Sequence, residues 1–267
     1  MAMNNEIMGL LRDYVKSYKN IKKTESAWKE PVVGFASAED PMFLALKDQI
    51  SPSHALPTDF IKDAKSIIVF FLPFHDEIIK SNIGNIESSR AWDIANIETN
   101  NLIVDINKYM HDKIREKGYT STLLPPTYNY DEEKLISDWS HRHVGYIAGI
   151  GTFGINNMFI TEQGCCGRMG SIITNMPLLP TERKTQEICL YKYNGSCKKC
   201  VEKCVASAIS TENGYPFVNK KRCNDQIYND NIPEYPIGLG DTCGKCMCGV
   251  PCSSKNPVQR FLDSYTK

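Results

Sequence analysis

The stretch CKKCVEKC, residues 197–204, decides the fold of the C-terminal third of the chain. It places two residues between Cys197 and Cys200 and three between Cys200 and Cys204. A second stretch, CGKCMCGVPC at residues 243–252, is equally rich in thiols. The 267 residues include 11 cysteines, of which none precedes Cys165. Thiols crowded at this spacing indicate a metal-binding module.

The cysteines are expected to be metal ligands rather than disulfides. The N-terminal residues 1–20 space apolar side chains like one face of a helix and mix both charge signs, unlike a secretory signal. We therefore expect a cytoplasmic protein, where structural disulfides are rare. The longest apolar run, residues 67–72, is far shorter than the ~20 residues of a membrane helix. The 31 basic and 31 acidic residues balance, so net charge favours neither nucleic acid nor a membrane.

The cysteine spacing predicts two [4Fe-4S] clusters. Bacterial two-cluster ferredoxins use two C-x2-C-x2-C-x3-C runs, and the fourth thiolate of each run binds the other cluster. In the first run Cys189 takes the place of the missing first member, with LYKYNGS looped out. The second run is more open and begins at Cys223. We predict one cluster on Cys189, Cys197, Cys200 and Cys252, and the other on Cys204, Cys223, Cys243 and Cys246.

Some alternatives stay open for the thiols. Cys248 could replace Cys246 or Cys252 as a ligand. Structural zinc also uses CxxC pairs, although a triplet with a spaced fourth member, present twice, favours clusters. Cys165 and Cys166 are spare thiols, either buried apolar side chains or a redox or substrate contact.

The part before the cysteine module predicts an α/β domain. Residues 32–36 (VVGFA) and 67–72 (IIVFFL) are typical of short buried strands. Residues 102–114 carry apolar side chains at helical spacing, and Gly118 is placed to end that helix. Residues 119–139 are rich in loop formers. Prolines near residue 180 divide the chain into an α/β domain, residues 1–180, and a cysteine domain, residues 181–267.

The glycine-rich stretch GIGTFG, residues 149–154, has three interpretations. It satisfies the dinucleotide fingerprint G-x-G-x-x-G. That fingerprint should follow a strand, whereas the preceding SHRHVGYIA is polar and helix-like. It should also be followed, about twenty residues later, by an acidic residue at the end of a second strand, and this sequence has none there. The glycines could instead form tight turns or let the backbone lie against a flat cofactor.

Together with AKSIIVFFLPF (64–74) and AGIGTFGINNMFI (148–160), the cysteine module resembles the epoxyqueuosine reductases and the related reductive dehalogenases, most of all their short clostridial and archaeal members. The resemblance covers about residues 30 to 257. It implies a nitroreductase-like α/β (α+β) cobalamin-binding domain followed by a ferredoxin-like domain with two [4Fe-4S] clusters. Electrons from a low-potential donor such as ferredoxin or flavodoxin would pass through the clusters to the corrinoid, which would reduce a small molecule or, as a second choice, tRNA.

The resemblance also implies site residues. Expected cobalamin contacts are Gly149, Gly151, Gly154, Asn156 and Arg142. The family's acidic proton donor aligns without gaps on Leu135, so Asp138, one small gap away, is the candidate donor. His141 and Tyr130 are the other catalytic candidates, and structural roles are the alternative for all three.

A second function stays open. The unmatched acid at Leu135 also fits a cobalamin-free electron-transfer or activating protein that reduces another enzyme or corrinoid protein. Many family members continue into helical repeats that help hold tRNA, whereas this sequence ends fifteen residues after Cys252, which weakens the expectation of tRNA.

Overall fold

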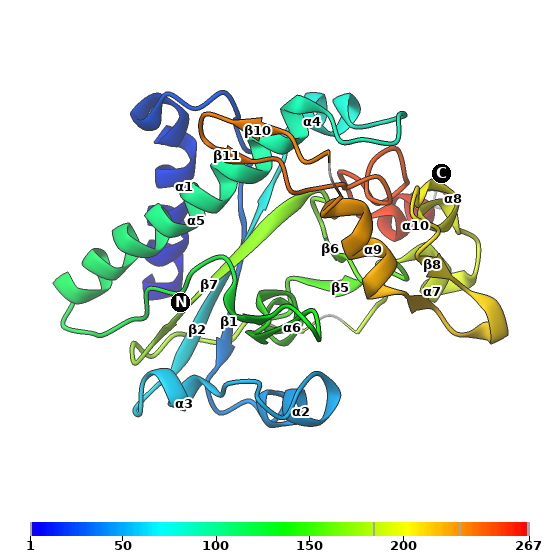
Figure 1. The fold of residues 1–267 in the computed structure, drawn as a ribbon. Helices are drawn as coiled ribbons and strands as arrows, with labels where there is room; N and C mark the ends of the chain where they lie inside the picture. The colour runs from blue at the N-terminus through cyan, green and yellow to red at the C-terminus, as the bar shows by residue number, and fades with distance from the viewer. Residues whose placement is uncertain (1, 184, 230, 266–267) are drawn as a thin grey trace.

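A three-stranded antiparallel sheet forms the centre of the larger domain, which is the part of the chain before the cysteine module (Figure 1). The computed structural model describes residues 2–183, 185–229 and 231–265. The strands of the sheet are β1 (Val32–Ser37), β2 (Ser66–Pro73) and β7 (Gly167–Thr174), in the order β1-β2-β7. All eight residues of β2 are buried because helices cover both faces of the sheet. The two predicted strands are confirmed.

Helices cover the two faces of this sheet and make three layers. On one face lie α1 (Ala2–Lys22) and α5 (Arg90–Glu116), packed on Ile68, Phe70 and Leu72 of β2. On the other lie α2 (Met42–Gln49) and α6 (His141–Ile147), packed on the intervening β2 residues, among them Val69 and Phe71. Successive strand side chains point to opposite faces, so the single run IIVFFL supplies both cores.

Helix α5 begins about three turns before the predicted helix. Ser89 caps it by accepting a hydrogen bond from the backbone nitrogen of Trp92. The apolar spacing hid these turns because Asp93, Asn96 and Glu98 are polar and yet buried. The expected loop at residues 119–139 contains a hairpin of β3 (Tyr128–Asp131) and β4 (Ile136–Trp139).

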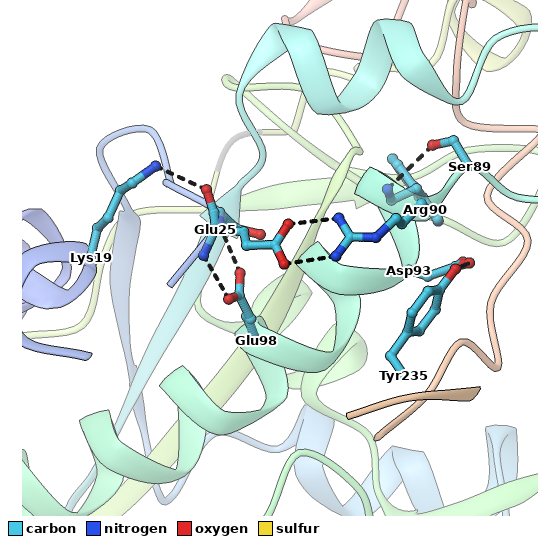
Figure 2. Close-up of polar contacts among 9 residues, drawn as sticks. Lys19, Glu25, Ser89, Arg90, Asp93, Glu98 and Tyr235 are labelled. Atoms are coloured by element: carbon cyan, nitrogen blue, oxygen red, sulfur yellow. Dashed lines mark hydrogen bonds and ion pairs between the residues drawn. The ribbon is translucent and has the colours of Figure 1, made fainter. Parts of the chain in front are cut away.

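The buried acids of α5 tie other segments to this helix (Figure 2). The Glu98 carboxylate accepts hydrogen bonds from the backbone nitrogens of residues 25 and 26, at 2.8 and 2.7 Å. The side chain of Glu25 accepts two bonds from Arg90, at 2.7 and 2.8 Å. The Tyr235 hydroxyl donates to Asp93 Oδ2 at 3.0 Å. Helix α5 thereby holds both the entry to β1 and a hairpin of the cysteine module.

Short elements make up the rest of the chain. The larger domain also contains α3 (Pro57–Phe60), α4 (Asp76–Ser81) and a hairpin of β5 (Gly151–Phe153) and β6 (Phe159–Thr161). The cysteine module has two further hairpins, β8 (Ile209–Ser210) with β9 (Phe217–Val218) and β10 (Glu234–Tyr235) with β11 (Gly238–Leu239). Its helices are α7 (Leu190–Asn194), α8 (Lys199–Lys203), the 3-10 turn Glu212–Gly214, α9 (Lys220–Ile227) and α10 (Pro257–Tyr265). The module lies beside the β5–β6 hairpin (Figure 1).

The turn between β6 and β7 joins the two parts of the molecule. The backbone nitrogen of Cys165 donates to the Cys252 carbonyl at 2.9 Å, and that of Cys166 donates to the Ser253 carbonyl at 3.0 Å. Gly164 precedes this pair with φ +84°, and a Cβ there would lie 2.6 Å from the backbone of Ser253. The pairing therefore requires glycine at this position.

Across the described ranges, none of the helices combines the length and apolar character needed to cross a membrane.

Replacing Gly164 by alanine should destabilise the protein more than the matched change Gly118→Ala. Gly118 has φ +83° and open space around its Cα, so alanine there costs about 1 kcal/mol of backbone strain. At Gly164 the same strain is joined by collision with the backbone of Ser253, for a total of about 3 kcal/mol. Urea unfolding of both variants measures the difference. Equal losses would show that the turn does not fix the cysteine module.

Candidate functional site

Four cysteines line one cavity between the β5–β6 hairpin and the cysteine module. The cavity measures about 340 Å³ including its open mouth, and Ile155, Ile160 and Val250 contribute apolar walls. Its thiols are those of Cys189, Cys197, Cys200 and Cys252. This set, the first thiol group, is the one that the crossing rule assigns to one cluster.

Local structure explains how Cys189 joins residues that lie eight or more positions away. Cys189 is the residue immediately before α7, and the looped-out LYKYNG forms that helix and the residue that follows it, Gly195, at φ +76°. The chain then turns back through Cys197. The missing first member of the run is thus supplied from the start of a single short helix.

The electrostatics of the first thiol group show that its members are close neighbours. Burial, followed by the charges of Cys252, Cys189 and Cys197, raises the pKa of Cys200 to about 12. Four thiolates cannot accumulate in an apolar cavity without a compensating positive charge. The donor set therefore fits a cationic, thiophilic group such as an iron-sulfur cluster.

The second thiol group consists of Cys204, Cys223, Cys243 and Cys246. Burial raises the pKa of Cys246, and the charges of Cys243, Cys204 and Cys223 raise it further. The backbone nitrogen of Ala208 donates to Cys204 Sγ at 3.2 Å. The structure thus also brings the second predicted set together, and Cys200 of the first group adds to the same rise in the pKa of Cys246. The two groups are adjacent.

Three other thiols lie in the core next to these groups. Cys165, Cys166 and Cys248 are each at most 1% exposed. Cys166 Sγ donates to the Met247 carbonyl at 3.2 Å, and Cys165 Sγ lies 4.0 Å from Cys252 Sγ. Cys248 Sγ accepts from Asn82 Nδ2 at 3.6 Å. Cys248 therefore packs outside the first cavity, whose lining does not include it.

Lys245 and Asn82 are functional candidates that the sequence did not reveal. Lys245 is 5% exposed and lies between two cysteines of the second group. Its Nζ donates to three oxygens, Asn82 O, Asn82 Oδ1 and Gly84 O, at 3.2, 3.1 and 2.8 Å. Burial lowers the pKa of Lys245, and the charges of Cys243 and Cys248 act in the opposite direction by raising it. A lysine between two predicted ligand cysteines is a visible signal in the sequence, whereas Asn82 offers none.

The glycine motif belongs to a hairpin and not to a nucleotide site. It follows α6 and enters the antiparallel pair β5 and β6, so it does not join a strand to a helix as a dinucleotide site requires. A Cβ at Gly149 would lie 2.9 Å from Glu182 O, and one at Gly151 would lie 2.2 Å from Ile160 O. Contacts within the chain thus account for these glycines, and their contact with a corrin stays a prediction.

Asn156 and Arg142, the other residues expected at a corrin, lie next to the second thiol group. Asn156 Nδ2 donates to the Cys246 carbonyl at 3.2 Å and lies 3.8 Å from Cys246 Sγ. Arg142 is exposed and donates to the Asn157 carbonyl at 2.8 Å. Its charge partly opposes the rise that burial causes in the pKa of Cys223. Both residues stay candidates for a cofactor bound beside this group.

The three catalytic candidates do not converge. Asp138 and Tyr130 share the β3–β4 hairpin, but Tyr130 pairs with Ser137, so strand alternation directs Asp138 to the other face. Asp138 accepts hydrogen bonds from Ser53 Oγ and Asn129 Nδ2. Tyr130 is 45% exposed. Among the residues described, no hydrogen bond joins either of them to His141.

His141 is a buried, neutral histidine. Its Nε2 donates to the Pro125 carbonyl at 3.1 Å, since a carbonyl can only accept. In the neutral ring Nδ1 then has no proton, so it accepts from Ser171 Oγ at 2.9 Å, and that hydroxyl also accepts from Trp139 Nε1. Burial lowers the pKa of His141 to about 4. Both ring nitrogens are therefore engaged inside the domain.

Within residues 2–183, 185–229 and 231–265, no three Cys, His, Asp or Glu side chains are arranged to hold a single metal ion.

Comparison with known proteins identifies the fold. No protein-family model matches the sequence, and no curated protein matches it either. Among solved structures, an epoxyqueuosine reductase from Streptococcus thermophilus matches with a TM-score of 0.57 and 16% identity, over 98% of this chain and 73% of that one. A selenomethionine-labelled epoxyqueuosine reductase matches with a TM-score of 0.51 and 18% identity, over 94% and 70%.

A reductive dehalogenase has a similar fold. A catabolic enzyme of this class matches with a TM-score of 0.56 and 17% identity, over 88% of this chain, but the chain spans only 32% of that protein. A structure of the same class, described as suggesting a mechanism for B12-dependent dehalogenation, gives the same values. The resemblance inferred from the sequence is confirmed at the level of the fold.

Acid should destabilise the protein through His141. Its pKa is about 4 in the folded state against 6.5 for a free histidine, so below pH 6.5 the unfolded state binds more protons and stability falls with pH. The expected loss between pH 7.5 and 5.5 is about 1 kcal/mol. Urea unfolding at the two pH values, compared with His141→Gln, isolates this contribution. An identical pH dependence in the variant would contradict a neutral, buried imidazole.

Iron content should separate Cys189 from Cys248. Cys189→Ala removes one lining thiol of the first cavity, so iron per chain should fall below the about eight atoms of two complete clusters. Cys248→Ala, the same change at another buried thiol, should leave iron unchanged. The measurement is iron and acid-labile sulfide after anaerobic purification. The opposite result would make Cys248 the ligand.

Proposed function

We propose that this protein is an iron-sulfur reductase with two [4Fe-4S] clusters that resembles epoxyqueuosine reductase. The observation that carries the proposal is the gathering of Cys189, Cys197, Cys200 and Cys252 around one cavity. These thiols come from three separate segments, which only the fold brings together. The second thiol group would hold the other cluster.

The proposal extends to the path of the electrons. The two thiol groups adjoin each other through Cys200 and Cys246, which suits transfer from one cluster to the next. The second group adjoins Arg142 of α6, one of the residues expected at a corrin. A low-potential donor such as ferredoxin or flavodoxin would supply the electrons to the module.

The destination that we propose is a corrinoid bound by the larger domain, beside the second thiol group. The support is the fold shared with the reductases. A bound corrinoid would supply a cobalt centre able to pass electrons to a small-molecule substrate or, less favoured, to a nucleoside of tRNA. Asn156 and Arg142 are the candidates to contact it, together with the glycines 149, 151 and 154. Asp138, His141 and Tyr130 remain the proposed sources of a proton.

The second candidate function is a cobalamin-free protein that passes electrons to another enzyme or corrinoid protein. It is favoured by the contacts of the glycine motif, since Gly149 and Gly151 lie against Glu182 O and Ile160 O of the chain itself. Packing within the chain therefore explains why these two positions are glycines, without a flat cofactor. The clusters are common to both candidates.

Anaerobic purification followed by cobalamin titration distinguishes these functions. The protein should contain about eight irons and eight sulfides per chain and, once reduced, give the EPR signal of [4Fe-4S] clusters. Stoichiometric binding of added cobalamin with a base-off cobalt signal would support the reductase. Clusters without cobalamin binding would support the electron-transfer protein. A colourless protein with zinc in place of iron would contradict both.

A further inference from the structure

We propose that the larger domain gives each cluster one side-chain hydrogen-bond donor, and that each donor raises the reduction potential of its own cluster. Cys165 donates to Cys252 of the first thiol group, and Asn156 donates to Cys246 of the second. The inference rests on the proposed two-cluster function, but not on the corrinoid.

Cys165 is held against Cys252 by its own backbone. Its backbone nitrogen donates to the Cys252 carbonyl at 2.9 Å, and the two Sγ atoms are 4.0 Å apart. The Met247 carbonyl is also 4.0 Å from Cys165 Sγ, but it already accepts from Cys166 Sγ at 3.2 Å and Ser253 Oγ at 2.7 Å. The acceptors left for the Cys165 thiol are therefore two sulfurs, that of Cys252 and that of the neighbouring Cys166, and of these only Cys252 belongs to a thiol group.

Cluster binding fixes the direction of this contact. A cysteine that ligates iron is a thiolate and has no proton to donate. Cys165 is 1% exposed, and an uncharged thiol is the form that such burial favours. With Cys252 on a cluster, Cys165 is necessarily the donor of the S–H···S bond.

The side-chain amide of Asn156 has only one orientation that satisfies its surroundings. Its Oδ1 accepts from the backbone nitrogen of Met158 at 3.2 Å, which leaves the NH₂ group to face Cys246. The donor contacts the Cys246 carbonyl at 3.2 Å and lies 3.8 Å from its Sγ. Asn156 is 3% exposed, so water does not compete for either contact.

Hydrogen bonds of this kind change the reduction potential by a simple electrostatic effect. Reduction adds one electron from the external donor to the cluster, breaks no bond and transfers no proton. The reduced cluster carries one more negative charge, part of which lies on the ligand sulfurs. A donor aimed at such a sulfur stabilises the reduced form more than the oxidised form, so its removal shifts the potential to a more negative value.

The test is potentiometric titration of the two clusters, followed by EPR, in the full-length protein. Cys165→Ala should shift one midpoint potential to a more negative value, and Asn156→Leu should shift the other. Cys165→Ser retains a donor and should keep its midpoint near that of the unmodified protein. Cys166→Ala is the matched control, because Cys166 donates to a carbonyl and not to a ligand sulfur. Asn156→Ala, which removes the donor without adding a charge, replaces the leucine variant if that variant loses iron.

Two results would overturn the inference. One is unchanged midpoints in both Cys165→Ala and the Asn156 variant, and the other is a shift in Cys166→Ala as large as that in Cys165→Ala. Iron content and EPR of the unmodified protein are measured first. Absence of clusters there overturns the proposed function itself, whereas intact clusters with unshifted variants overturn only the hydrogen-bond assignment.

Discussion

Two backbone hydrogen bonds hold Cys252, the last cysteine of the chain, against the larger domain. The backbone nitrogen of Cys165 donates to the Cys252 carbonyl, and that of Cys166 donates to the Ser253 carbonyl. Cys252 lies 48 positions after Cys204 in the sequence, so the first run of thiols cannot place it alone. The turn at Gly164 lets the two backbones approach closely enough to pair. The first cavity is therefore a property of both parts of the molecule, not of the cysteine module alone.

Buried polar groups hold the other half of the site. Asn82 donates to the Cys243 carbonyl at 2.8 Å and accepts from Lys245, and Trp92 Nε1 donates to Thr242 Oγ1 at 3.0 Å. These contacts join the end of α4 and the start of α5 to the loop that contains Cys243 and Cys246. Lys245 brings a positive charge into this loop, where thiolate ligands would be negative. The end of α4 and the start of α5 thus anchor the loop of the second thiol group.

The sequence was sufficient where the determining signal was local. The strands at residues 32–36 and 67–72 follow from continuous apolar runs, whereas the ligand sets come from a spacing rule and stay predictions. The first turns of α5 were hidden because Asp93 and Glu98 are buried through partners distant in sequence, Tyr235 and the backbone near residue 25. That the amide of Asn156 faces Cys246 is visible only in the fold, and its contact with a corrin stays a prediction. His141 was a catalytic candidate, and nothing local indicated that Ser171 and Pro125 engage both its nitrogens.

The wide separation of the ligands along the chain also has a consequence for biosynthesis. Residues 189–200 leave the ribosome well before Cys252, and the larger domain that positions Cys252 is complete earlier still. During that interval three thiols of the first cavity are present without the fourth. The cavity closes only when the segment that contains Cys252 reaches the β6–β7 turn, so its four thiols come together late in the folding of the chain.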